Sequence, residues 1–327
     1  MFLYITIVVV TVVIYYTFFK KSIKYISADS NKCVFITGCD SGFGLNAAKQ
    51  LDYLGFTVIA TCITDDGEQR LRTSCSKNLH VIKMDVTDTK QVQSAYDYVK
   101  NNMKSENDLW AVINNAGVCR IGPLDWQSLE EIKKMADVNL WGLIDVTKTF
   151  LPLLKNSGGR LVNITSIGGR LSLPYMGAYC TSKFAVEAFT DALRVELCNW
   201  KMKTILVEPG FFKTAMTAKN ALGSQLDQTW SNLPEDKKLE YGEEFFKKTK
   251  ENILSGVVDT CASPNIVVVI DAIVDAVMSL NPKIRYVLGW DANLIWLFLS
   301  RLPCGIGDFL KRHISKIEVP QKLKGLK

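Results

Sequence analysis

The sequence has only two histidines, His80 and His313, so it is poor in the residue type that proteins use most for proton transfer near neutral pH. Neither histidine has a cysteine or a second histidine at the spacing of a zinc site. We therefore expect no bound metal. Any proton chemistry must rest on another kind of side chain, and a phenol held beside an ammonium ion is one candidate.

The nine cysteines are odd in number, scattered along the chain and never arranged as CxxC. This pattern argues against a framework of disulfides and fits a reducing compartment. We interpret most of these thiols as small buried apolar groups.

The formal net charge of +6 is spread along the chain, apart from a basic C-terminal end. Residues 291–327 form an apolar and then basic tail, which we interpret as a solvated end or a contact with anionic lipid. We expect no nucleic-acid partner.

The first 19 residues, Met1 to Phe19, contain no charged side chain, and Lys20, Lys21 and Lys24 follow. As a helix this run would span roughly 28 Å, close to the bilayer's hydrocarbon thickness of about 30 Å. The alternative is a cleaved signal peptide, but no basic residue precedes the run and no A-x-A site ends it. Residues 1–24 are therefore predicted to be a transmembrane anchor, with the rest of the chain in the cytosol.

Short apolar runs alternate with amphipathic, helix-length segments after the anchor. Continuous apolar strands are expected where helices cover both faces of a parallel sheet, so the pattern predicts a doubly wound α/β domain over residues 30–290. Residues 211–261 interrupt this rhythm as a polar insertion. The expected strands are residues 33–38, 57–63, 79–86, 109–117, 159–166, 203–210 and 283–290. The expected helices are residues 45–54, 89–103, 128–154, 178–200 and 264–280.

A glycine-rich segment, TGCDSGFG, directly follows the first expected strand. Gly38 would permit a tight turn, Gly42 would let the backbone approach a pyrophosphate, and Gly44 would let helix and strand pack closely. The spacing is G-x-x-x-G-x-G, which differs from the G-x-G-x-x-G of two-domain dehydrogenases.

Several further motifs follow in order: NNAG at Asn114 to Gly117, Asn139, Ser166, the Tyr179/Lys183 pair, and Pro209 with Gly210. With the glycine loop, they make residues 32–290 resemble the short-chain dehydrogenase/reductases. The segments TGCDSGFG, EPGFFKTAMT and RYVLGWDA are similar to those of the membrane-bound retinol dehydrogenases and 17β/3α-hydroxysteroid dehydrogenases. The resemblance implies a single-domain Rossmann-type fold, in which 211–261 is the substrate lid.

Tyr179 and Lys183 are four residues apart at the start of an expected helix, so they share one helix face. A free phenol has a pKa of about 10. A nearby ammonium, together with the positive ring of an oxidised nicotinamide, would favour the phenolate and lower that pKa. Tyr179 would then act as the general base. The alternative is an exposed helix face without chemistry.

The other site residues are assigned from the resemblance. Ser166 would orient the substrate oxygen, and Asn139 would kink its helix and hold a water that bridges to Lys183. Substrate contacts would come from Ser166, Phe211, Phe212 and Met216, although the two phenylalanines could simply pack the lid onto the core. Cofactor contacts would come from Gly38, Asp40, Ser41, Gly42, Phe43, Gly44, Asp85, Val86, Asn115, Ala116, Gly117, Tyr179, Lys183, Pro209 and Gly210.

The cofactor is predicted to be NAD. A 2′-phosphate needs a basic side chain near the glycine loop or the end of the second strand. Those places hold Asp40, Asp65 and Asp66, and the first basic residue after the second expected strand is Arg70. The usual strand-end aspartate is also missing, so NADP stays open.

These inferences together predict an NAD-dependent oxidation of an apolar alcohol, such as a retinol or hydroxysteroid. The alternatives are an NADPH-dependent carbonyl reductase, a D-3-hydroxybutyrate dehydrogenase with Lys213 as the carboxylate-binding cation, and a non-catalytic lipid or steroid binder. We expect membrane lipid as a partner. The resemblance is also compatible with assembly as a homodimer. The expected location is the endoplasmic reticulum membrane, with a mitochondrial membrane as the alternative.

Overall fold

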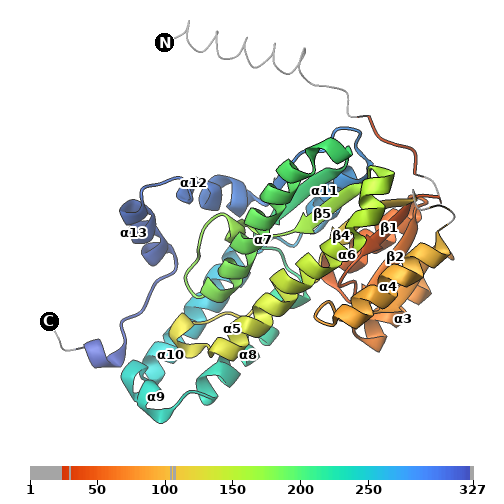
Figure 1. Ribbon diagram of the computed structural model, residues 1–327. Coiled ribbons are helices and arrows are strands. Elements are labelled where there is room, and N and C mark those ends of the chain that lie inside the picture. Colours follow the sequence, from red (N-terminus) through yellow and green to blue (C-terminus); the bar gives the residue numbers. More distant parts are fainter. Residues whose placement is uncertain (1–23, 29–30, 104, 106–107, 325–327) are drawn as a thin grey trace, which may run out of the picture.

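The computed structural model describes residues 24–28, 31–103, 105 and 108–324 (Figure 1). Its centre is a parallel sheet of seven strands in the order β3-β2-β1-β4-β5-β6-β7. The predicted doubly wound fold is confirmed, and each of the seven expected strands is present. The strands are β1 (Cys33–Ile36), β2 (Thr57–Cys62), β3 (Leu79–Lys83), β4 (Leu109–Asn114), β5 (Arg160–Ile164), β6 (Lys203–Pro209) and β7 (Arg285–Leu288).

Helices cover both faces of this sheet. One face packs against α2 (Gly42–Tyr53), α3 (Asp65–Ser74) and α11 (Val267–Met278). The other packs against α4 (Thr89–Asn102), α6 (Leu143–Ser157) and the end of α7 (Gly177–Glu196). On that face the rings of Phe35 and Phe150 stack with their centroids 4.3 Å apart. Because both faces are covered, the strands are largely apolar, which is the pattern expected from the sequence.

Two helical regions differ from the expectation. The predicted helix 128–154 is divided into α5 (Leu129–Ala136), a π-helical segment (Asp137–Gly142) and α6. Helix α3 was not predicted, because it is strongly polar and buries only Gly67 and Leu71.

The predicted lid, 211–261, is largely helical. It contains α8 (Lys219–Ser231), α9 (Glu235–Tyr241), α10 (Glu243–Ile253) and a π-helical segment, Leu254–Cys261. Its apolar side chains pack with those of α5 and of the region around Tyr179 into a third hydrophobic cluster. After β7 the chain forms α12 (Leu297–Leu299) and α13 (Cys304–Ile314), which lie to one side of the sheet (Figure 1).

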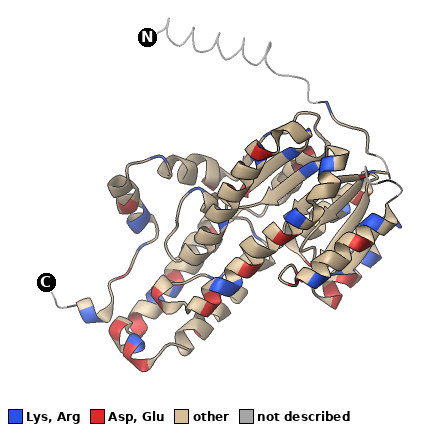
Figure 2. Cartoon of the chain, viewed as in Figure 1, with Lys and Arg blue, Asp and Glu red and all other residues tan. Residues whose placement is uncertain are grey.

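Residues 1–23 of the predicted anchor lie outside the described residues. Within the described ranges, no helix is both long enough and apolar enough to cross a bilayer. Acidic and basic residues are interspersed over the helices that the structure describes (Figure 2).

Candidate active site

The predicted motifs meet at the carboxyl ends of the central strands. The glycine loop follows β1, NNAG ends β4, Ser166 follows β5, and Pro209 ends β6. In a parallel sheet these ends lie along one edge, where doubly wound folds bind their ligands. Gly38 has φ +69°, and a Cβ there would lie 2.7 Å from the Cα of Ala116. Glycine is therefore required for this close approach of β1 and β4.

The N-terminus of α2 is suited to an anion. Ser41 caps this helix without a side-chain hydrogen bond, and Gly42 has φ +60°. The first backbone N–H groups of the helix are thus available to a phosphate, which the helix dipole also favours. A Cβ on Gly44 would lie 2.4 Å from Nδ2 of Asn115, so Gly44 serves close packing, as the sequence suggested.

A cavity of about 460 Å³ lies beside this helix N-terminus. Its position and glycine-rich wall fit a dinucleotide. Of the predicted cofactor contacts, Gly44 is absent from its lining, and Pro209 and Gly210 line a neighbouring cavity instead. The predicted contacts that do line it are Gly38, Asp40, Ser41, Gly42, Phe43, Asp85, Val86, Asn115, Ala116, Gly117, Tyr179 and Lys183.

Tyr179 and Lys183 lie in the first turns of α7 and are both buried, with exposed fractions of 8% and 4%. The alternative of an exposed helix face is therefore wrong. Nζ of Lys183 donates a hydrogen bond to the carbonyl oxygen of Ile164 (3.1 Å) and lies 5.7 Å from the centroid of the Tyr179 ring.

Burial shifts the pKa of both groups toward their neutral forms. It lowers the pKa of Lys183 to about 8. It also raises the pKa of Tyr179 above its ordinary value, with a smaller contribution from Cys119, and a hydrogen bond with Ser166 opposes the shift. For the protein alone the pKa of Tyr179 is thus raised by desolvation, which is opposite to the direction predicted for Tyr179 beside an ammonium and an oxidised nicotinamide.

Ser166 caps the 3-10 turn Ile167–Gly169. Its hydroxyl oxygen accepts a hydrogen bond from the N–H of Gly168 (3.1 Å), and the hydroxyl donates to the carbonyl of Pro209 at 3.4 Å. The latter contact is long, so the hydroxyl can turn toward a bound oxygen atom.

Asn139 is fully buried inside the π-helical segment, so the predicted irregularity of this helix is present. Its Oδ1 accepts from the N–H of Val118 (2.8 Å), and its Nδ2 donates to the carbonyl of Val118 and to Oγ of Ser182. A Cβ on Gly117 would lie 3.3 Å from Oδ1 of Asn139 and 3.7 Å from Nζ of Lys183. The side-chain amide of Asn139 and the ammonium of Lys183 thus both lie close to Gly117. The bridging water stays a prediction.

A second cavity, of about 470 Å³, adjoins the first. Ser166, Phe211, Phe212 and Met216 all line it, and Tyr179 and Met216 line both cavities. The ring of Phe211 packs edge-on against Trp296 and that of Phe212 against Phe43. The two phenylalanines therefore both pack the lid and line the cavity.

Sequence reasoning missed part of this cavity's wall, which comes from distant segments. Ile253, Trp296 and Ile314 line it, the last two from beyond β7. Asp291 was missed as well. It is fully buried, and its Oδ2 accepts from the N–H of Phe211 (2.9 Å) and the indole of Trp296 (3.1 Å). The sequence did contain one signal for Asp291, because this acidic residue directly follows the expected strand 283–290.

Asp40 lines the first cavity and interacts electrostatically with Lys83, a cation that the sequence analysis did not consider. The carboxylate of Asp40 accepts from the N–H groups of Ile63 and Thr64 at the end of β2. Lys83, at the end of β3, reaches the carbonyl of Ile63 (3.3 Å). However, Lys83 is paired with Asp65 at 2.5 Å, so the Asp40 end of the cavity keeps an excess of negative charge.

The sequence profile of the short chain dehydrogenase family matches residues 32–224, and the chain belongs to this family. It is 40% identical over 298 residues to short-chain dehydrogenase/reductase family 9C member 7 of Mus musculus, covering 90% of this chain and 94% of that protein. It is 38% identical to 17-beta-hydroxysteroid dehydrogenase type 6 of Homo sapiens and 40% identical to retinol dehydrogenase 16 of Rattus norvegicus. Each of these two matches covers 88% of this chain and 90% of the relative.

Solved structures share the fold at low sequence identity. A Burkholderia phymatum short chain dehydrogenase/reductase in complex with NAD gives a TM-score of 0.68 at 22% identity, covering 87% of this chain and 96% of that one. A Burkholderia cenocepacia short chain dehydrogenase in complex with NADP gives 0.64 at 22% identity, covering 90% and 100%. The family match and the dehydrogenase-named relatives show that the chain is an oxidoreductase of this family.

Replacing Lys183 by Met should raise the thermal stability of the cofactor-free protein at pH 7, because it removes a buried charge. The unfolded chain keeps the proton of Lys183 up to its ordinary pKa of 10.5, whereas the folded protein releases it near pH 8. Between these values the unfolded state binds more protons, so this group makes the wild-type stability rise with pH. The advantage of Lys183→Met should therefore be largest below pH 8 and shrink toward pH 10.5.

Melting temperatures of both proteins between pH 6.5 and 10 measure this difference. Lys148→Met, on the exposed side of α6, is the control and should show no pH-dependent difference from wild type. If Lys183→Met is the less stable protein at pH 7, the burial penalty inferred for Lys183 is wrong.

Proposed function

We propose that this protein oxidises an apolar alcohol of the retinol or hydroxysteroid type with NAD, and that Tyr179 is the general base. The observation that carries the proposal is the position of Tyr179, which lines both the glycine-bordered cavity and the neighbouring cavity. A proton acceptor at this junction can contact a hydroxyl in one cavity while the carbon beside it faces a nicotinamide in the other.

The residues of the site divide the chemistry among them. Tyr179 takes the hydroxyl proton, and Ser166 donates to the substrate oxygen and orients it. Lys183 supplies positive charge that favours the phenolate, while Asn139 holds the backbone of Val118, directly after Gly117. A bound nicotinamide would accept the hydride from the alcohol carbon.

The substrate class is supported by the cavity wall and by the relatives. Phe211, Ile253 and Trp296 give the second cavity an apolar wall suited to a large hydrocarbon body. Relatives at 38–40% identity are named as retinol or 17-beta-hydroxysteroid dehydrogenases. Lys213, the cation of the hydroxybutyrate alternative, does not line this cavity, although Lys316 does.

The Tyr179→Phe variant should bind NAD normally and lose alcohol oxidation by about three orders of magnitude or more, because only the proton acceptor is removed. Single-turnover rates and NAD titration measure the two properties separately. Retention of more than about a tenth of the activity would exclude Tyr179 as the base.

The same preparation should be assayed with retinoids, hydroxysteroids and 3-hydroxybutyrate. We expect the highest kcat/KM with an apolar alcohol. A preference for 3-hydroxybutyrate would reject the proposed substrate class and point to Lys316 as the carboxylate partner, which Lys316→Met would test.

The preference for NAD is supported by the negative charge at the Asp40 end of the first cavity. Asp40 lines the cavity, and the pairing of Lys83 with Asp65 leaves it little charge for a 2′-phosphate. The alternative is an NADPH-dependent reductase. A comparison of the dissociation constants for NAD and NADP distinguishes this alternative from the proposed NAD-dependent enzyme.

We expect Asp40→Asn to improve NADP binding relative to NAD by about tenfold, since it removes one repulsive charge at nearly constant shape. Dissociation constants for both nucleotides measure this ratio. Asp66→Asn is the matched control, because Asp66 lies outside the cavity lining and pairs with Arg70. Equal ratios in wild type and Asp40→Asn would count against Asp40 as the discriminating group.

Membrane contact through the C-terminal segment is a further part of the proposal. Leu294, Phe298 and Phe309 are exposed by 72%, 60% and 59%, and basic Arg301 and Arg312 lie near them in the sequence. Apolar side chains with flanking cations suit an anionic bilayer surface. The endoplasmic reticulum location, its mitochondrial alternative and the cytosolic orientation stay predictions.

The Phe298→Ser/Phe309→Ser double variant should raise the KM for an apolar alcohol held in anionic vesicles several-fold, with kcat unchanged, since substrate would enter from the bilayer. The same variant should be normal when the alcohol is presented in detergent micelles. Val195→Ser, an equally exposed position on α7, is the control. An unchanged KM in vesicles would refute the contact.

A further inference from the structure

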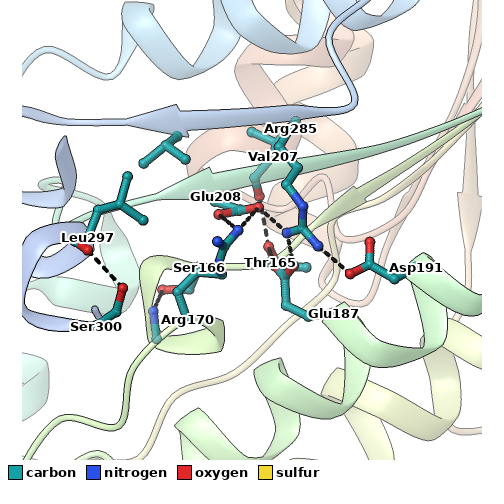
Figure 3. A network of polar contacts seen from close by, with 12 residues as sticks. Thr165, Ser166, Arg170, Glu187, Asp191, Val207, Glu208, Arg285, Leu297 and Ser300 are labelled. Atoms are coloured by element: carbon teal, nitrogen blue, oxygen red, sulfur yellow. Dashed lines mark hydrogen bonds and ion pairs between the residues drawn. The ribbon is translucent and has the colours of Figure 1, made fainter. Parts of the chain in front are cut away.

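A charged network lies beside Thr165 and Ser166 (Figure 3). Its centre is Arg285 on β7, whose guanidinium pairs with Glu187 on α7, with Glu208 on β6 at 2.5 Å, and with Asp191 on α7 at 2.5 Å. Arg170 adds a longer contact of 3.4 Å to Glu208. Glu187 and Glu208 are both buried, so the arginines neutralise two carboxylates that the protein removes from water.

Glu187 connects this network to the site. It is one helical turn beyond Lys183, about 6 Å along the axis of α7. Its Oε1 accepts a hydrogen bond from the hydroxyl of Thr165 at 2.6 Å, and Thr165 directly precedes Ser166. A Cβ on Gly169 would lie 2.8 Å from Cγ of Glu187, so the same side chain also packs against the turn that Ser166 caps.

We propose that Glu187 is a positioning residue for the reaction: anchored by Arg285, it holds the start of α7, with Tyr179 and Lys183, in register with Ser166. The inference rests on the proposed role of Tyr179 as the base. Glu187 and Arg285 line neither cavity, whereas Thr165 lines both, so Glu187 acts through its neighbours, by geometry and by charge.

The charge effect has a defined sign. The groups facing Glu187 are Arg285, Glu208, Lys183 and Asp191. Burial raises the pKa of Glu187, and the nearby carboxylate of Glu208 raises it further. Arg285 opposes this shift, because its positive charge favours the ionised form of Glu187. Ionised Glu187 in turn raises the pKa of Lys183 against the larger effect of burial. Without this negative charge the ammonium is disfavoured and the phenolate favoured, so both groups lose protons at lower pH.

Three variants of the full chain separate geometry from charge. Glu187→Gln keeps an oxygen for the Thr165 hydroxyl and removes the charge. Glu187→Asp keeps the charge and shortens the side chain. Asp191→Asn is the matched control, because Asp191 lies on the same helix and pairs with the same arginine, yet is one turn farther from Lys183.

The measurement is the pH dependence of kcat and KM for NAD-linked alcohol oxidation, with the melting temperature of each variant as the check on folding. We expect Glu187→Gln to move the apparent pKa of kcat about half a unit or more to lower pH. Glu187→Asp should lower kcat about tenfold or more, with an unchanged apparent pKa and an unchanged KM for NAD, because the site is displaced. Asp191→Asn should change neither.

The proposal is overturned if Glu187→Gln and Glu187→Asp leave both kcat and its pH profile at the wild-type values. It is equally overturned if Asp191→Asn reproduces their effects, since the network would then act only on stability. A variant that fails to fold is replaced by Thr165→Val, which removes the hydrogen bond to Glu187 and a longer contact with the carbonyl of Val207, and which should lower kcat without moving the pKa. Failure of the proposed function itself is recognised separately, by activity that survives in Tyr179→Phe.

Discussion

The burial of one ammonium ion is the constraint on which this site depends. Lys183 is almost inaccessible to solvent, and the structure gives its Nζ a protein acceptor in the carbonyl of Ile164. An ammonium removed from water is costly unless nearby dipoles and charges compensate. The carbonyl at the end of β5, the Tyr179 ring and the carboxylate of Glu187 supply that compensation from three directions. The sheet edge and the start of α7 must therefore keep a fixed relative position, to which the hydrophobic cluster around Tyr179 contributes.

This dependence explains why the fold concentrates its polar interior behind the site. Buried ion pairs contribute little net stability compared with apolar packing, so Glu187, Glu208 and Arg285 are poorly explained as stabilising elements alone. Their arrangement is informative because each carboxylate lies next to a segment of the proposed site: Glu187 near Lys183, and Glu208 directly before Pro209 and Gly210. A geometry that must be held to within fractions of an ångström gains from directional contacts of this kind.

The sequence predicted those features that local pattern determines. The seven strands are continuous apolar runs, the glycine loop has a recognisable spacing, and Tyr179 and Lys183 share a helix face because of the helical period. Features set by topology could not be predicted in this way. Lys83 reaches the carbonyl of Ile63 because β3 lies beside β2, and Asp291 reaches Phe211 because β7 lies beside β6. At Asn139 only a kink within one continuous helix was predicted, and not a π-helical segment, because the apolar period of this segment continues that of the flanking helices.

The predicted catalytic residues and the residues that line the substrate cavity come from different parts of the chain. The family profile ends at residue 224, and by then β1 to β6 and all four predicted catalytic residues have been supplied. Much of the wall of the second cavity follows later, from Ile253, Trp296 and Ile314. Structures at 22–24% identity can therefore share the sheet and leave the substrate undetermined. Relatives near 40% identity are matched over nearly 300 residues, so these matches extend well beyond residue 224. For this reason their names bear on the substrate proposal, whereas the solved structures bear on the fold.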